Sequence, residues 1–313
     1  MGMLKRAGAA FAALATAGIG VQARAAEYLG RPTPNAIDLQ AAASPLKHQV
    51  IFFHNVILLP IITAITVFVA FLLLYCVFRF NKKANPEPAR WSHNTPIEVL
   101  WTVVPVLILM FIAIFSFKLL YAYHDMPPPD VTVKATGNQW YWAYEYPDLK
   151  VSEYTSNVLP EGKAPPGLYP LAADEPLVVP VHKVVRVLVT GADVIHAFAV
   201  PAFGVKIDAI PGRVNQTWFN AEQVGTYYGQ CSELCGIDHA FMPIEVKVVS
   251  QADFDKWVVS KGGTVGGAPV IPAASAATPA AATAPAASSA PAASSAPAAS
   301  SAPAASSAPA AKN

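Results

Sequence analysis

The chain has 313 residues, which is enough for about two domains. Hydrophobic residues make up 54% of it and charged residues only 13%, a balance that indicates membrane-spanning segments. The formal net charge of +1 excludes a strong overall electrostatic field and gives no support to nucleic-acid binding. Three cysteines are too few for a framework of disulfides.

Residues 1–25 have the features of a signal peptide. A basic start at Lys5 and Arg6 is followed by an apolar, alanine-rich stretch and by small residues near Ala25, where we expect cleavage. An uncleaved membrane anchor is the alternative. Residues 26–47 are polar and form an expected N-terminal segment outside the membrane.

Two long apolar runs follow, residues 56–78 and 99–117, and neither contains a charged residue. Each is close to the ~20 residues that cross a bilayer as a helix. The loop between them carries one acid, Glu87, against four basic residues: Arg79, Lys82, Lys83 and Arg90. Because basic loops stay in the cytoplasm, we predict a transmembrane hairpin over residues 48–123 whose two outer ends face the external side. A cleaved signal peptide predicts the same orientation.

The next part of the chain, residues 124–260, has the pattern of an all-β domain. Short alternating segments separated by Gly and Pro predict an antiparallel sandwich or barrel. The candidate strands are residues 131–136, 140–146, 184–190, 214–219 and 244–249. Residues 151–176, rich in Pro, Gly and Ala, are predicted to be a long surface loop.

Residues 261–313 form a low-complexity tail of Ala, Pro and Ser. Proline recurs every six residues between Pro285 and Pro309. Such a segment has almost no apolar surface to bury, so we expect it to be disordered. A six-residue β-helix repeat is disfavoured, because no large apolar residue recurs.

Four potential metal ligands are crowded into residues 231–242: Cys231, Cys235, His239 and Met242. Thiolate, imidazole and thioether together select copper, whereas methionine is a poor zinc ligand. His196, after a probable strand, is the candidate for a further strong ligand. A disulfide between the two cysteines is the alternative in an exported protein.

The number of thiols distinguishes between copper sites. A mononuclear blue-copper site needs one cysteine, two histidines and a weak axial methionine, but this sequence offers two cysteines. Two thiolates can bridge two copper ions, each capped by one histidine, with Met242 and the Glu233 carbonyl as weak outer ligands. Sharing one electron over two metals reduces the rearrangement at each transfer, which suits a fast one-electron relay.

Several motifs together resemble subunit II of the haem–copper cytochrome c oxidases of bacteria and mitochondria. They are residues 137–146 (GNQWYWAYEY), 192–196 (ADVIH), 205–213 (VKIDAIPGR) and the copper loop 231–242. With the hairpin, the resemblance covers about residues 45–260. The quinol-oxidising relatives lack the copper ligands, which this sequence retains.

The resemblance implies a dinuclear copper centre, CuA, with these ligands: His196, Cys231, the Glu233 carbonyl, Cys235, His239 and Met242. It also implies that the Glu233 side chain reaches a magnesium ion shared with subunit I. No Cys-x-x-Cys-His motif for a haem of the chain's own occurs in the sequence.

The resemblance implies roles for residues outside the copper loop. Trp140 would be the exposed ring that accepts the electron from cytochrome c, although packing within a strand is the ordinary role of such aromatics. Glu145, Asp148 and Asp193 would dock the basic cytochrome, unless they are ordinary surface acids. Glu98 would mark the entrance of a proton-uptake path, unless it is simply an interfacial carboxylate.

Together these features predict a two-helix membrane hairpin followed by an external, cupredoxin-like Greek-key β-barrel. The implied function is that of a proton-translocating cytochrome c oxidase, in which electrons pass from cytochrome c through CuA to haem in subunit I, where oxygen is reduced to water. The implied partners are subunits I and III, cytochrome c and membrane lipid, in a bacterial inner membrane with both mature termini in the periplasm. A membrane-anchored copper carrier and the CuA subunit of another terminal reductase are the alternatives.

Overall fold

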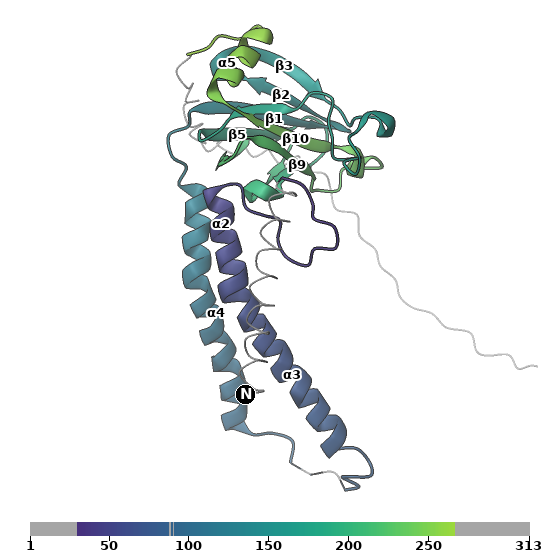
Figure 1. The fold of residues 1–313 in the computed structure, drawn as a ribbon. Coiled ribbons are helices and arrows are strands. Elements are labelled where there is room, and N and C mark those ends of the chain that lie inside the picture. The colour runs from purple at the N-terminus through teal and green to yellow at the C-terminus, as the bar shows by residue number, and fades with distance from the viewer. Residues whose placement is uncertain (1–29, 88, 90, 267–313) are drawn as a thin grey trace, which may run out of the picture. The chain divides into compact units, whose positions relative to one another are not determined.

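The computed structural model describes residues 30–87, 89 and 91–266 (Figure 1). The predicted signal peptide, residues 1–25, lies outside the described residues. So do Arg90 of the basic loop and residues 267–313 of the predicted tail.

Two helical stretches form the first part of the described chain. The first consists of α2 (Pro45–Phe52), the π-helical turn η1 (Phe53–Leu58) and α3 (Leu59–Arg79), and the second is α4 (Thr95–His124). Pro45–Arg79 and Thr95–His124 are both long and apolar enough to cross a membrane, judged by length and composition. Each stretch contains one of the two predicted apolar runs.

Polar side chains cap the starts of these helices. Ser44 Oγ accepts a hydrogen bond from the Lys47 N–H at 3.1 Å. At the start of α4, the Asn94 side chain accepts an N–H of the first turn, while Glu98 Oε1 accepts the Asn94 N–H at 3.2 Å. Because this reciprocal capping satisfies N–H groups that have no partner within the helix, Glu98 helps to define where α4 begins.

Two five-stranded sheets form the β domain in the described residues, with strand orders β3-β2-β1-β5-β8 and β4-β10-β9-β6-β7. The strands are β1 (Val131–Asn138), β2 (Tyr141–Tyr146), β3 (Val151–Ser156), β4 (Leu177–Pro180), β5 (Val184–Gly191), β6 (His196–Val200), β7 (Val205–Ala209), β8 (Asn215–Asn220), β9 (Gly225–Cys231) and β10 (Pro243–Val249). The pairs β1–β5 and β4–β10 are parallel, so the purely antiparallel arrangement that we expected is wrong. Strands of the other sheet intervene along the chain between the two members of each parallel pair, and the predicted fold class, a helical hairpin followed by a β domain, is confirmed.

The core lies between the inner faces of the two sheets. Alternate residues of β2 point inward, and Trp142, Tyr144 and Tyr146 are completely buried. Phe198 and Met242 from the second sheet and the loop before β10 belong to the same cluster. This cluster includes Cys231, Cys235 and Met242, so these three predicted ligands are embedded in the core rather than attached to its surface.

Residues 151–176 are not the bare surface loop that we expected. Val151–Ser156 form β3, and Leu168 and Ala172 pack against Tyr228 in a second, smaller core. The sequence interpretation also missed helix α5 (Gln251–Ser260), whose Phe254 and Val258 are buried. Only two buried side chains in ten residues are too few to produce a clear helical period.

Candidate metal centre

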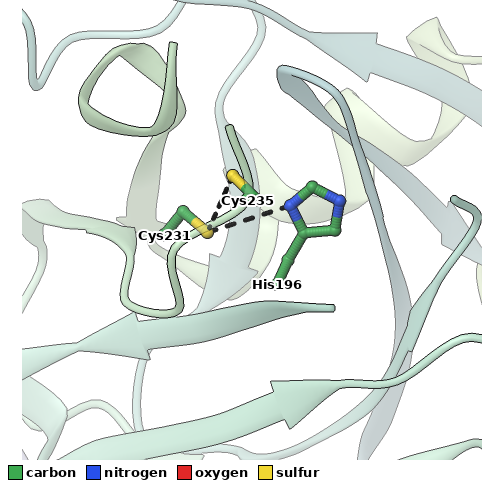
Figure 2. A group of neighbouring side chains, drawn as sticks. All are labelled: His196, Cys231 and Cys235. Carbon is green, nitrogen blue, oxygen red and sulfur yellow. Dashed lines mark hydrogen bonds between the residues drawn. The ribbon is translucent and has the colours of Figure 1, made fainter. Parts of the chain in front are cut away.

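The predicted ligands converge where strand β6 begins and strand β9 ends. His196 is the first residue of β6 and Cys231 is the last residue of β9, and these strands are neighbours, with Phe198 opposite Cys231. The Ser232 N–H donates to the Ala197 carbonyl at 3.1 Å and continues this pairing. The copper loop therefore leaves the sheet directly beside the His196 imidazole (Figure 2).

Two thiols lie at the centre of the cluster, with an imidazole next to each. Cys231 Sγ is 3.9 Å from His196 Nδ1 and 3.9 Å from Cys235 Sγ (Figure 2). Cys235 Sγ is in turn 3.5 Å from His239 Nδ1. Both cysteines are free thiols, and the ligand atoms of His196, Cys231 and Cys235 lie within 4.8 Å of one another. The fold therefore places these groups in the order imidazole, thiol, thiol, imidazole.

The two predicted weak ligands lie beside Cys231. Its Sγ is 3.4 Å from the Glu233 carbonyl oxygen. Its backbone N–H donates to the Met242 carbonyl at 3.0 Å, which closes the loop and brings Met242 back to the end of β9. The Met242 side chain is completely buried, whereas Glu233 is exposed.

Asp193 determines the orientation of the His196 ring. Its Oδ1 is 2.8 Å from His196 Nε2, and the carboxylate also accepts the N–H groups of Val194 at 2.7 Å and Gln139 at 2.8 Å. Gly137 also lies close to the ring and leaves no room for a side chain, because a Cβ there would lie 2.8 Å from His196 Cδ2. With Nε2 bonded to the carboxylate, Nδ1 is the nitrogen available to a metal.

The environment separates the acidities of the two thiols. Burial opposes ionisation of Cys231, but hydrogen bonds with His196 and the backbone outweigh it and lower its pKa to about 6. Burial and the charge on Cys231 raise the pKa of Cys235 to about 12. For His196, burial lowers the pKa, but the contacts with Cys231 and Asp193 raise it overall. A metal that binds both thiolates must therefore displace the proton of Cys235.

The donor set fits copper. Two thiols, two imidazoles and a thioether are soft or borderline ligands, and Cys231, Cys235, His196 and Met242 are buried. Hard cations such as calcium or magnesium would require a shell of oxygen ligands instead.

Trp140 is half-buried rather than the exposed ring that we expected. Its Nε1 is buried, and this atom has no hydrogen-bond partner within the part of the chain that the structure describes. A Cβ on Gly236 would lie 2.9 Å from Trp140 Cζ2, so the indole rests against the backbone of the copper loop. Gly236 has a φ of +133°, which favours glycine at this contact.

The three predicted docking acids do not form one exposed patch. Glu145 is paired with Lys134 at 3.1 Å, and Asp193 is bonded to His196. Asp148 is only 6% exposed, which does not fit the docking role expected for it, because a buried carboxyl is not presented to a partner. The sequence interpretation missed the orienting contact of Asp193, although its spacing of three residues from His196 was visible.

Sequence interpretation also missed Gln139, which contacts two segments of the site. Its backbone N–H donates to Asp193, and its side-chain Nε2 donates to the Cys235 carbonyl at 2.7 Å. No local pattern identifies such a residue, because both of its partners are distant in the sequence.

Comparison with known proteins identifies the family. Residues 131–249 match the family described as cytochrome c oxidase subunit II, periplasmic domain, and residues 32–119 match its transmembrane domain. The cytochrome c oxidase subunit 2 of Cereibacter sphaeroides is 46% identical over 283 residues, covering 84% of this chain and 93% of that protein. The probable cytochrome c oxidase subunit 2 of Rickettsia conorii is 48% identical over 238 residues, covering 76% of this chain and 75% of that protein.

Among solved structures, the periplasmic domain of subunit II of the cytochrome oxidase of Bradyrhizobium japonicum is 58% identical. The matched region covers 44% of this chain and 96% of that domain, with a TM-score of 0.41. Because both family domains match in order, and a relative matches over nearly its whole length, the chain belongs to the cytochrome c oxidase subunit II family.

Proposed function

We propose that this chain holds a dinuclear CuA centre and accepts electrons one at a time from cytochrome c. The electrons then pass to haem in subunit I, where oxygen is reduced to water with proton translocation. The observation that carries the proposal is the pair of free thiols 3.9 Å apart, with one imidazole Nδ1 next to each. A single-copper site would have no use for the second thiol.

The residues that would hold the metals are His196, Cys231, the Glu233 carbonyl, Cys235, His239 and Met242. When bound, the copper pair supplies a one-electron carrier with its charge shared over two metals. The chain's own residues provide the rigid frame for it: Asp193 and Gly137 hold the His196 ring, and the core buries both thiols. Such a frame limits rearrangement when the charge changes.

Trp140 is the proposed electron acceptor at the surface. Its half-buried ring rests against Gly236, which directly follows Cys235, so it joins the outside of the domain to the copper loop by van der Waals contact. Glu145 and Asp193 are the partly exposed acids that remain for steering a basic cytochrome.

The proposal also assigns the chain a position within the membrane-bound oxidase complex. The helical stretches Pro45–Arg79 and Thr95–His124 would anchor the chain beside subunits I and III in a bacterial inner membrane, with the β domain in the periplasm. Glu98, at the start of α4, would stand at the entrance of the proton-uptake path, in addition to its capping contact. The exposed Glu233 side chain would reach a magnesium ion shared with subunit I.

Electron paramagnetic resonance of the copper-loaded, full-length chain in detergent tests the metal centre. We expect two coppers per chain and a seven-line hyperfine pattern from an electron shared equally by both. Cys231→Ser should abolish this pattern, and Cys76→Ser, which changes the free and exposed thiol of α3, should leave it intact. A four-line spectrum with one copper per chain would overturn the proposal and favour a copper carrier.

Rapid mixing of the assembled oxidase with reduced cytochrome c tests the role of Trp140. We expect Trp140→Ala to slow reduction of the copper centre while the copper content and its resonance spectrum stay the same. Unchanged reduction kinetics in this variant would exclude Trp140 as the acceptor.

A further inference from the structure

We propose that Gln139 is a positioning residue that ties together the two ligand-bearing segments of the metal centre, one carrying His196 and the other Cys235. The role of these contacts in a copper site rests on the proposed function. The contacts themselves belong to the fold and can be tested without metal.

Gln139 lies in the turn between β1 and β2 and makes one hydrogen bond to each segment. Its backbone N–H donates to Asp193 Oδ2 at 2.8 Å, and its side-chain Nε2 donates to the Cys235 carbonyl at 2.7 Å. Asp193 Oδ1 is 2.8 Å from His196 Nε2. A continuous chain of hydrogen bonds therefore leads from His196 through Asp193 and Gln139 to Cys235.

The part of the loop that carries Cys235 depends on these hydrogen bonds, because the pairing of the sheet does not extend to Cys235. Cys231 ends β9 and is fixed by pairing with β6, but Cys235 follows the end of that strand and lies in no regular element. Among the described residues, Gln139 supplies the hydrogen bond to the Cys235 carbonyl. The separation of the two thiols therefore depends on a side chain from a third, distant segment.

The chemistry of the contact requires a glutamine. The acceptor is a carbonyl oxygen, so the side chain must end in a donor, and a glutamate of the same length would present a second oxygen to it. Asparagine is one methylene shorter and would not span the 2.7 Å contact from the same backbone position. Gly236 provides the space, because a Cβ there would lie 3.1 Å from Gln139 Nε2.

The turn that carries Gln139 also carries the proposed electron acceptor, Trp140. A single short turn therefore orients the Asp193 carboxylate that contacts His196, fixes the Cys235 backbone and sets the indole against Gly236. This arrangement holds the ligand geometry and the route of electron delivery in one rigid unit, which is what precise function at a metal site requires.

Hydrogen exchange of the copper loop in the metal-free, full-length chain tests the proposal directly. The chain is kept in detergent with a reductant, so that both thiols stay free, and the amides of residues 232–239 are followed. In Gln139→Ala and Gln139→Glu we expect the hydrogens of these amides to exchange about fivefold faster than in the unmodified chain. This is the factor expected for the loss of one hydrogen bond. Asn138→Ala is the matched control. Within the part of the chain that the structure describes, Asn138 Nδ2 donates only to the Thr136 carbonyl of its own strand, β1.

Copper loading provides the second readout. In the Gln139 variants we expect a changed hyperfine splitting and faster copper loss to a chelator, and in Asn138→Ala neither change. Gln139→Glu keeps the backbone bond to Asp193, so it decides the outcome if Gln139→Ala fails to fold. Exchange in Gln139→Glu equal to that of the unmodified chain would overturn the proposal. A one-copper spectrum in the unmodified chain would instead overturn the proposed function and leave the exchange result standing.

Discussion

His196 directs its Nε2 to the Asp193 carboxylate, 2.8 Å away, and its Nδ1 to the Cys231 thiol, 3.9 Å away. The imidazole is completely buried, whereas the Asp193 side chain is 35% exposed. Burial raises the pKa of Asp193, but hydrogen bonds from His196 and from the N–H groups of Val194 and Gln139 outweigh it and hold the pKa below its ordinary value. Asp193 is therefore ionised at neutral pH and fixes which nitrogen of His196 faces the thiols.

Asp193→Asn should weaken copper binding by about 10- to 100-fold, the usual effect of losing a group that orients a metal-bound histidine. An amide cannot hold His196 Nε2–H as strongly as a carboxylate can, and its other end would present a donor to the donor N–H of Gln139. The measurement is a competition titration with a copper chelator. The control is Asp208→Asn, an exposed acid on β7, and an equal loss in both variants would contradict the orienting role.

Gly137→Ala should displace the His196 ring, because a Cβ at this position would lie 2.8 Å from Cδ2 and 2.9 Å from Cγ of the imidazole. Overpacking of this kind lowers the free energy of unfolding by about 1–3 kcal/mol. Chemical denaturation of the metal-free chain measures this loss, and a chelator titration measures the accompanying loss of copper affinity.

Gly162→Ala is the matched control for that substitution. Gly162 lies in the short helix η3 (Glu161–Lys163), and no atom lies within 4 Å of a Cβ built on it. Its unfolding free energy should stay within about 0.5 kcal/mol of the unmodified chain. The steric explanation fails if the two variants behave alike.

Tyr146→Phe and Tyr144→Phe should have different effects, although both side chains are completely buried on β2. The Tyr146 hydroxyl donates to the Val178 carbonyl at 2.6 Å and accepts the Val178 N–H at 3.0 Å. Its removal leaves these buried groups unpaired and should lower the free energy of unfolding by about 1–3 kcal/mol.

The Tyr144 hydroxyl has no hydrogen-bond partner among the described residues, 30–87, 89 and 91–266. Tyr144→Phe should therefore be neutral or stabilising, since it removes a buried polar atom that makes no bond. Denaturant titration of the two variants side by side provides the comparison. Equal destabilisation of the two variants would contradict the stabilising role of the Tyr146 hydrogen bonds.

Glu245→Gln should change the pH dependence of stability. Burial raises the pKa of Glu245 above its ordinary value, although the hydrogen bond from the Ala173 N–H partly opposes this. The stability that this carboxyl contributes is therefore full below its ordinary pKa and is lost as the pH rises through the raised pKa. The glutamine keeps an acceptor for Ala173 but does not ionise.

Relative to the unmodified chain, Glu245→Gln should therefore gain stability as the pH rises from about 4 to 8. Thermal unfolding of the metal-free chain across this range measures the change. Glu161→Gln, at an exposed site in η3, should show no such trend. A difference between Glu245→Gln and the unmodified chain that does not vary with pH would contradict the role of burial.

The sequence alone was sufficient for features that depend on one continuous segment. Residues 56–78 and 99–117 predict membrane helices, because length and apolarity are properties of the run itself. The same holds for the chemistry of residues 231–242, where two thiols, an imidazole and a thioether occur within twelve positions. The strand pattern also predicted β1, β2, β5, β8 and β10 to within a few residues.

Only the tertiary structure decided which distant residues meet. His196 reaches Cys231, 35 positions away, because β6 and β9 are neighbours. Tertiary contacts elsewhere joined Asp193 to Gln139 and buried Asp148, which had been expected at the surface. Strand order and register depend on how the whole core packs, and no local pattern contains that information. The identity of the ligands is thus local, whereas the orientation of the ligands is a property of the complete fold.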